Sequence, residues 1–207
     1  MLQSTSSRGG SLSPNPRRMA LAVLRATQEG AIPEDVLARD GVMLSSKDMN
    51  LASALVYACL RHQSRLDFLI DEKLSALGKT SKVVRIILRL GLAQILFFDR
   101  LGEHAIVNET AELSKKFAPG REGLVNAVLR GFLREKEGGP YFPQEIDGAD
   151  TPINKRLAVL YSYPDWFVEK LLALYGFRET RSILIAGNQP ATPTLRVNPR
   201  ATTREGL

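Results

Sequence analysis

The apolar stretch Val83-Val-Arg-Ile-Ile-Leu-Arg-Leu-Gly-Leu-Ala-Gln-Ile-Leu-Phe-Phe98 is the clearest indication of architecture in this chain. Ser81 stands where a helix N-cap is expected, and the apolar side chains that follow occupy nearly every face of the helix. Such a helix belongs in the middle of a bundle, because only neighbouring helices can cover so much apolar surface. The stretch carries Arg85, Arg89 and Gln94 and is shorter than the roughly 20 residues of a membrane span, which favours a protein core.

Amphipathic helices are predicted on both sides of this central helix. Asn15 and Pro16 are typical of a helix start, and Gly30 is typical of a helix end. Ser45 and Asp48 have the spacing of a capping box. The pattern therefore predicts an all-α protein. The predicted helices cover residues 16–28, 33–39, 46–74 with a break or bend at 62–64, 82–98, 104–117 and 120–135.

The chain changes character after residue 136. Residues 138–152 contain three Pro, three Gly and only acidic charges, which indicates a linker. Beyond it, three short amphipathic helices are expected to begin at Pro152, Pro164 and Gly176.

The last residues indicate more chain to come. Pro193–Pro199 is the only good strand candidate in the sequence. Thr202 and Glu205 have capping-box spacing, which predicts the start of a helix. The sequence stops two residues after Glu205, which is too short for that helix to form. We therefore expect this chain to be a fragment, with a further domain following it.

The composition is that of an ordinary globular protein with a basic balance. Of the 207 residues, 44% are hydrophobic and 24% are charged. The net charge of +6 and the pI of about 9.6 favour polyanionic partners. Cys59 is the only cysteine, so no intramolecular disulfide or cysteine metal cage can form. Residues 1–14 lack the apolar segment of a signal peptide and are predicted to be a disordered leader, which favours a cytoplasmic protein.

No active site is expected from the residue pattern. His62 and His104 are the only histidines, and neither has metal-ligand spacing to a cysteine or to the other. Cys59 falls on an apolar helix face without an acid–base partner, which is typical of a buried structural thiol. The sequence also lacks a strand, glycine loop and helix in succession, the pattern of a nucleotide-cofactor cradle. We therefore expect no catalytic residue, metal or cofactor in this chain.

Basic side chains at the start of the first helix suggest an RNA contact. Arg17 and Arg18 lie in its first turn, and Arg25 follows Arg18 on the same face. Positive charge there opposes the helix dipole, so a partner explains the placement better than helix stability does. Free N–H groups and guanidinium groups at one place suit phosphate oxygens. A solvated face is the commoner explanation of such a pattern when it stands alone.

A second basic set near the end of the bundle contains Arg130 and Arg134, which share a helix face. Glutamates are interleaved with these residues, so ion pairing on the helix surface remains the alternative to RNA binding. Arg85 and Arg89 share a face of the central helix, and we assign them no functional role.

Six strings resemble, in their order and spacing, the NusB family of RNA-binding helical domains. They are Arg17–Leu24, Leu55–Arg61, Leu66–Ile70, Arg89–Leu96, His104–Glu109 and Val125–Arg130. The match covers roughly residues 16–136, and Val125–Arg130 is its most specific string. The resemblance implies a two-part helical bundle whose first helix contacts RNA, with Arg17 and Arg18 in the family's arginine-rich stretch.

Two strings after the bundle discriminate within that family. Tyr161–Trp166 and Leu195–Pro199 resemble the junction in the RsmB (Sun, Fmu) family of small-subunit rRNA cytosine-C5 methyltransferases. In that family the junction leads into a Rossmann-like domain that binds S-adenosylmethionine and carries the catalytic cysteines. No such domain is expected here, and Cys59 matches no catalytic cysteine.

The resemblance implies that this chain positions small-subunit rRNA for S-adenosylmethionine-dependent methylation by an absent C-terminal domain. The chain itself is then not an enzyme, although its parent protein is one. The expected organisation is a leader over residues 1–14, a NusB-like bundle over 15–136, a linker over 137–152 and a short helical segment over 153–207 that begins the junction.

Two other functions stay open at this point. NusB-like domains also serve as protein-interaction or transcription-antitermination modules, so a protein partner is the first alternative. A DNA-binding helix-turn-helix protein is the second, but the sequence lacks a polar recognition helix after a short glycine turn. The pattern predicts no membrane contact and does not predict an oligomeric state.

Overall fold

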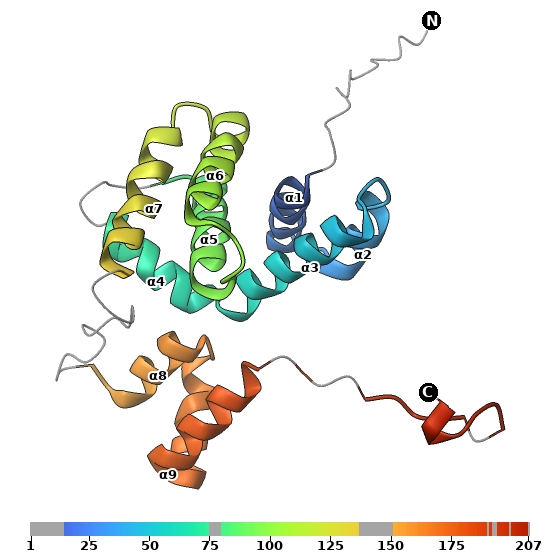
Figure 1. The fold of residues 1–207 in the computed structure, drawn as a ribbon. Helices are drawn as coiled ribbons and strands as arrows, with labels where there is room; N and C mark the ends of the chain where they lie inside the picture. Colours follow the sequence, from blue (N-terminus) through green and yellow to red (C-terminus); the bar gives the residue numbers. More distant parts are fainter. Residues whose placement is uncertain are drawn as a thin grey trace, which may run out of the picture.

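The computed structural model describes residues 15–74, 80–136, 151–189, 191, 194–198 and 200–206. The predicted leader and most of the predicted linker lie outside these residues. Within the described part the regular structure is helical, which confirms the all-α class (Figure 1). The helices are α1 (Pro16–Gln28), α2 (Pro33–Asp40), α3 (Ser46–Arg61), α4 (Gln63–Leu74), α5 (Lys82–Phe97), α6 (Glu103–Phe117), α7 (Glu122–Lys136), α8 (Ile153–Tyr161) and α9 (Asp165–Gly187), followed by a 3-10 turn at Arg204–Gly206.

The centre of the bundle is α5, as its apolar sequence predicts. It packs against α1, α3, α4, α6 and α7 (Figure 1). Its residues from Ile86 to Ile95 are all buried, including Arg89 and Gln94. One continuous core of Leu, Ile, Val and Ala side chains therefore runs from α1 to α7. Burial of this apolar surface is the main favourable term in folding the bundle.

The helix starts follow the predicted caps. The Asn15 side chain accepts hydrogen bonds from the first turn of α1, and Ser45 and Ser81 accept them at the starts of α3 and α5. These side-chain oxygens satisfy N–H groups that have no partner within the helix. His62 interrupts the helical run between α3 and α4, which confirms the predicted break at residues 62–64.

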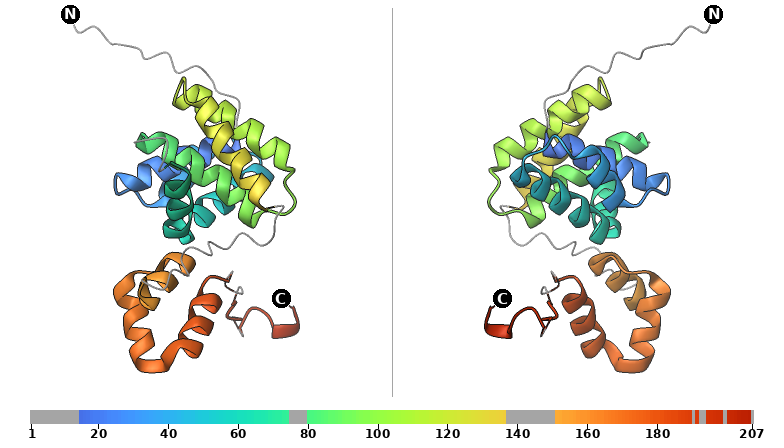
Figure 2. Two further views of the ribbon diagram at one scale, coloured as in Figure 1. Left: turned by 90° about the vertical axis from the view of Figure 1, so that its left-hand side faces the viewer. Right: turned by 90° about the vertical axis from the view of Figure 1, so that its right-hand side faces the viewer.

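A second, smaller core is formed by α8 and α9. It consists of Leu157, Ala158, Val168, Leu171 and Leu184. Helix α8 packs against α4, so this helical pair lies at one end of the bundle (Figure 2).

Two backbone positions shape this helical pair. Ser162, between α8 and α9, has a positive φ of 57°, and its Oγ accepts the Arg65 N–H at 3.0 Å. The residue that joins α8 to α9 thereby caps the start of α4. Gly176 has φ 71° and ψ 179° inside α9, a conformation that favours glycine. The kink divides α9 into two helices and confirms the prediction of three helices beyond the linker.

The predicted strand at Pro193–Pro199 is wrong for the residues the structure describes there. Residues 194–198 form no ladder with another segment of the described chain. A strand is stable only when its backbone groups pair with a neighbouring strand, and none is formed within the described ranges. None of the described helices is long and apolar enough to cross a membrane.

Candidate nucleic-acid interface

Arg17 contacts the central helix of the bundle. Its Nε donates a hydrogen bond of 2.7 Å to Oε1 of Gln94. Gln94 is fully buried and donates from its own Nε2 to the Leu90 carbonyl at 2.8 Å. Burial lowers the pKa of Arg17, and the charge of Glu109 opposes that shift. Arg17 therefore joins α1 to α5, and part of its guanidinium group is engaged by the protein itself.

The start of α1 differs from the sequence-based prediction of free N–H groups. Asn15 Oδ1 accepts the N–H groups of Arg17 and Arg18 at 2.9 and 3.1 Å, so a residue of the chain already occupies these donors. Arg18 is half-buried and Arg25 is exposed. The surface that α1 offers to a ligand therefore consists of side chains, with Arg25 the most accessible of the three arginines.

Arg130 and Arg134 are exposed on α7 and meet the start of α6. Together they line a pocket of about 300 Å³ with His104 and Asn108 of α6. Gly102, the N-cap of α6, provides no side-chain hydrogen bond to the first turn. The pocket thus combines two guanidinium groups, an imidazole and an amide beside a helix N-terminus. Glu103 is its one acidic lining residue. Phosphate and ribose oxygens are the natural ligands of such donors.

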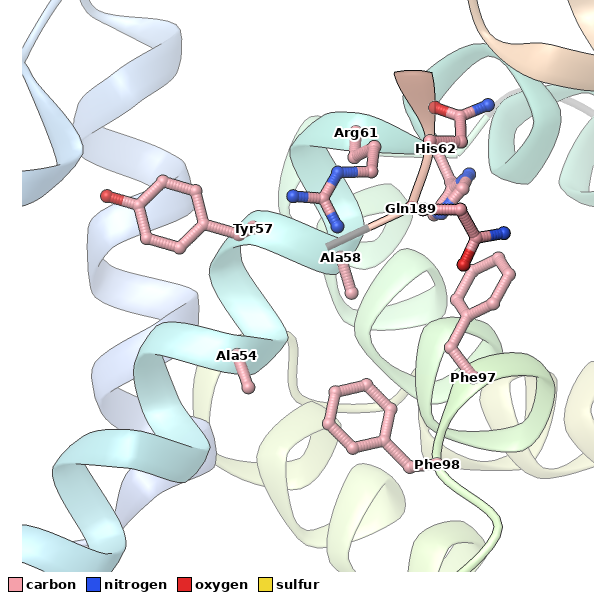
Figure 3. Close-up of a pocket in the computed structure, with 9 residues that line it drawn as sticks. Ala54, Tyr57, Ala58, Arg61, His62, Phe97, Phe98 and Gln189 are labelled. Carbon is pink, nitrogen blue, oxygen red and sulfur yellow. The ribbon is translucent and has the colours of Figure 1, made fainter. Parts of the chain in front are cut away.

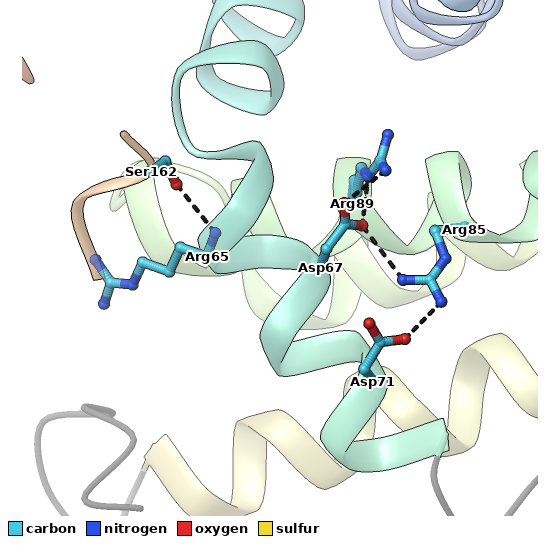
Figure 4. Close-up of polar contacts among 6 residues, drawn as sticks. All are labelled: Arg65, Asp67, Asp71, Arg85, Arg89 and Ser162. Carbon is cyan, nitrogen blue, oxygen red and sulfur yellow. Dashed lines mark hydrogen bonds and ion pairs between the residues drawn. The ribbon is translucent and has the colours of Figure 1, made fainter. Parts of the chain in front are cut away.

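Arg85 and Arg89 lie in an ion-pair cluster between α4 and α5 (Figure 4). Arg89 donates from Nε and Nη2 to the two carboxylate oxygens of Asp67, both at 2.7 Å. Arg85 reaches Asp67 at 3.4 Å and Asp71 at 2.5 Å. These arginines hold α4 and α5 together.

Cys59 is buried in the core. Burial raises the pKa of its thiol to about 12. The side chain is therefore a neutral core group, as its place on the apolar face predicts. Within the described residues, no group of three or more His, Cys, Asp or Glu side chains lies close enough together to hold a metal ion.

The comparisons with known proteins place this bundle in a family. The sequence profile of the NusB family matches residues 14–134, which is more than half of the chain. The chain belongs to the NusB family. A second profile, that of the ferredoxin-like domain of RsmF/B-like methyltransferases, matches residues 163–207, so α9 and the residues after it follow the NusB domain as a separate unit of sequence.

The curated relatives of this chain are named as small-subunit rRNA methyltransferases. A probable ribosomal RNA small subunit methyltransferase B of Synechocystis sp. is 34% identical over 165 residues, which are 78% of this chain and 35% of the relative. The ribosomal RNA small subunit methyltransferase B of Escherichia fergusonii is 33% identical over 188 residues, or 89% of this chain and 41% of the relative. The chain thus spans less than half the length of these curated relatives.

A solved structure shares the fold. The crystal structure of PH0851 superposes with a TM-score of 0.60 over 88% of this chain and 40% of that chain, at 15% sequence identity. The arrangement of the NusB bundle with the helices after it therefore occurs in a distant protein as well.

Sequence reasoning missed two residues of the α6–α7 pocket in this NusB domain. His104 and Asn108 are four residues apart, so they share the helix face that turns toward Arg130. The spacing was a usable signal, and both residues lie in a string that carries the NusB resemblance. The sequence does not show that α6 packs against α7 on that face.

The histidine between α3 and α4 makes the stability of this NusB domain depend on pH. Burial and the charges of Arg65 and Arg61 lower the pKa of His62 to about 4, against an ordinary value of 6.5. Between these two pH values the unfolded chain binds a proton at His62 that the folded chain does not. The contribution of His62 to the free energy of unfolding is therefore fully present above pH 6.5 and is lost as the pH falls towards 4. Because the ring is partly exposed, we expect a loss of about 1 kcal/mol.

Urea unfolding at neutral pH and near the lower end of this window measures the loss. His62→Phe, which keeps a ring against Phe97, should remove about that part of the pH dependence, whereas the exposed control His104→Phe should keep it. An unchanged pH profile for His62→Phe would contradict the assignment.

Proposed function

We propose that this chain binds structured RNA of the small ribosomal subunit and holds it for cytosine-C5 methylation by a domain outside the chain. The observation that carries the proposal is the α6–α7 pocket, which brings Arg130 and Arg134 together with His104 and Asn108. The names of the relatives support rRNA as the polyanion. The net charge of +6 favours binding of such a ligand.

The division of labour follows from the chemistry of the side chains. Guanidinium groups donate to phosphate oxygens and fix the position of an RNA without reading its bases. Arg130 and Arg134 provide this contact at one site. Arg18 and Arg25 provide further contacts on α1, and Arg17 joins α1 to α5. We place S-adenosylmethionine and the methyl transfer in the domain outside this chain, where a nucleophile and a cofactor cradle would be needed.

Removing the two α7 arginines should weaken RNA binding and reduce its salt dependence. For Arg130→Ala/Arg134→Ala we expect affinity for a small-subunit rRNA fragment to fall about tenfold. Binding of the variant neutralises fewer phosphates and therefore releases fewer counterions from the RNA. The slope of log affinity against log salt should shrink by about two. Fluorescence anisotropy across a salt series measures both quantities.

The matched control is Arg178→Ala/Arg181→Ala. It removes the same charge from exposed positions on α9, in the second unit of the chain. It should change the slope much less than the α7 double variant does. Equal slopes for both double variants would show that net charge, and not the α6–α7 pocket, governs binding.

Protein docking is a second candidate function, favoured by the exposed apolar surface of α9. Leu174, Tyr175 and Phe177, which flank the kink at Gly176, are each more than half exposed. Clusters of exposed large apolar side chains are typical of protein contacts. A defined complex that survives RNase treatment and is lost in Tyr175→Ser/Phe177→Ser would support this function.

A further inference from the structure

A pocket lies where the bundle meets the end of α9. It has a volume of about 620 Å³, and Figure 3 shows most of its lining side chains. Tyr57, Arg61 and His62 come from the last turns of α3 and the residue after it, Phe97 and Phe98 come from the end of α5, and Gln189 follows α9. The site therefore needs both units of the chain to be in place.

The aromatic side chains of this pocket are already fixed in position. His62 stacks on Phe97 with ring centroids 4.2 Å apart and an interplanar angle of 25°. The hydroxyl of Tyr57 donates to Glu34 of α2 at 2.5 Å. Phe98 lies between Phe97 and the small side chain of Ala54 in Figure 3. All these rings are only half-buried.

The charges of the pocket have one sign. Arg61 is exposed at the pocket, and Arg65 lies close by, with its guanidinium carbon 6.0 Å from the centre of the Phe97 ring. The lining contains no carboxylate. Such a surface attracts an anion that also carries a flat apolar group.

The end of α9 contributes amide groups in a defined place. Asn188 donates from Nδ2 to the Tyr161 carbonyl at 2.9 Å, which fastens the last turn of α9 to the end of α8. The neighbouring Gln189 is exposed and lines the pocket. A glutamine amide can both donate to and accept from the polar edge of a base.

We infer that this pocket binds one unstacked nucleobase of a single-stranded RNA segment, with the base on the Phe98 ring and Arg61 on the adjoining phosphate. Aromatic rings beside an arginine are a general device for single-stranded RNA, because every base has a face that stacks. Gln189 meets the polar edge of the base. The inference rests on the proposed function and adds to it: the α6–α7 pocket holds the backbone, and this pocket selects RNA with an unpaired base.

A comparison of intact and abasic RNA tests the inference. The probe is a small-subunit rRNA hairpin in which each loop nucleotide in turn is replaced by an abasic one. For the wild-type chain we expect one loop position at which loss of the base weakens binding about tenfold, the scale of a single stacked base. For Phe98→Leu, which keeps an apolar side chain but removes the ring, that abasic penalty should shrink to about twofold or less.

Two further variants keep the result unambiguous. Phe117→Leu removes a half-buried ring from the end of α6 and should retain the full abasic penalty. Arg61→Gln changes an exposed residue, with little risk to folding, and should weaken binding of the intact hairpin while reducing the salt slope by about one.

The possible failures are distinguishable. If no loop position shows a penalty, or if Phe98→Leu keeps the full penalty, the pocket does not bind a base, although RNA binding through Arg130 and Arg134 stands. The same result is expected if a protein side chain occupies the pocket. If the wild-type chain does not bind the hairpin at all, the proposed function fails and this inference with it.

Discussion

Replacing Asp67 with alanine is expected to lower the free energy of unfolding by about 3 kcal/mol. Asp67 accepts two hydrogen bonds from Arg89, whose side chain is only 9% exposed, and a third from Arg85. Without the carboxylate, the buried Arg89 guanidinium loses the group to which it donates both of these hydrogen bonds. An uncompensated charge in such a place costs several kcal/mol. Urea denaturation followed by circular dichroism measures the change.

Asp71→Ala is the matched control for this prediction. Asp71 accepts a hydrogen bond from Arg85 of the same cluster, but its side chain is 60% exposed, so its loss should cost less than about 1 kcal/mol. The double replacement Asp67→Leu/Arg89→Met removes both charges together and should restore most of the stability. If Asp67→Ala and Asp71→Ala cost the same, burial of Arg89 is not what makes the pair important.

Replacing Gly91 with valine is expected to lower the free energy of unfolding by a similar amount, about 3 kcal/mol. Gly91 lies in α5 where α6 and α7 cross it. A Cβ there would lie 2.8 and 2.9 Å from the two methyl groups of Leu129 and 3.2 Å from the methyl group of Thr110. Leu129 and Thr110 are fully buried, so neither can move aside freely, and the two further methyl groups of valine need space of their own.

Gly131→Val is the control for that substitution. Gly131 lies in α7, and a Cβ at that position meets no atom within 4 Å. Since valine and glycine differ by only a few tenths of a kcal/mol in helix propensity, the control should change stability by less than about 0.5 kcal/mol. A loss at Gly91 no larger than at Gly131 would show that α6 and α7 can separate from α5 at little cost.

The helices and their order could be predicted from the sequence, because local signals specify them. Asn15, Ser45 and Ser81 mark helix starts, and the apolar run in α5 specifies the central helix of the bundle. The segment 194–198 shows the limit of such signals, since a strand depends on pairing with another strand. A local pattern shows that a residue prefers to be extended and does not show whether a neighbouring strand is present.

The candidate site could be predicted only in part. The spacing of Arg130 and Arg134 predicts that they share a helix face, and the structure adds the α6 residues that line a pocket with them. The contact of Arg17 with Gln94 could not be predicted from the sequence, because the two residues are 77 positions apart and lie on different helices. The aromatic pocket was missed for the same reason. Its walls come from α3, α5 and the end of α9, and each wall by itself looks like the edge of a hydrophobic core.

That separation between Arg17 and Gln94 has a consequence during synthesis of the chain. Helix α1 is made early, but α5, one of the three helices that pack against it, is made only some 77 residues later. At about 5–20 residues per second, α1 waits roughly 4–15 s before α5 has been made. During that interval Leu21, Val23 and Leu24, which are buried in the finished fold, lack their final cover. The earliest helix therefore reaches its full set of contacts only after the centre of the bundle has been made.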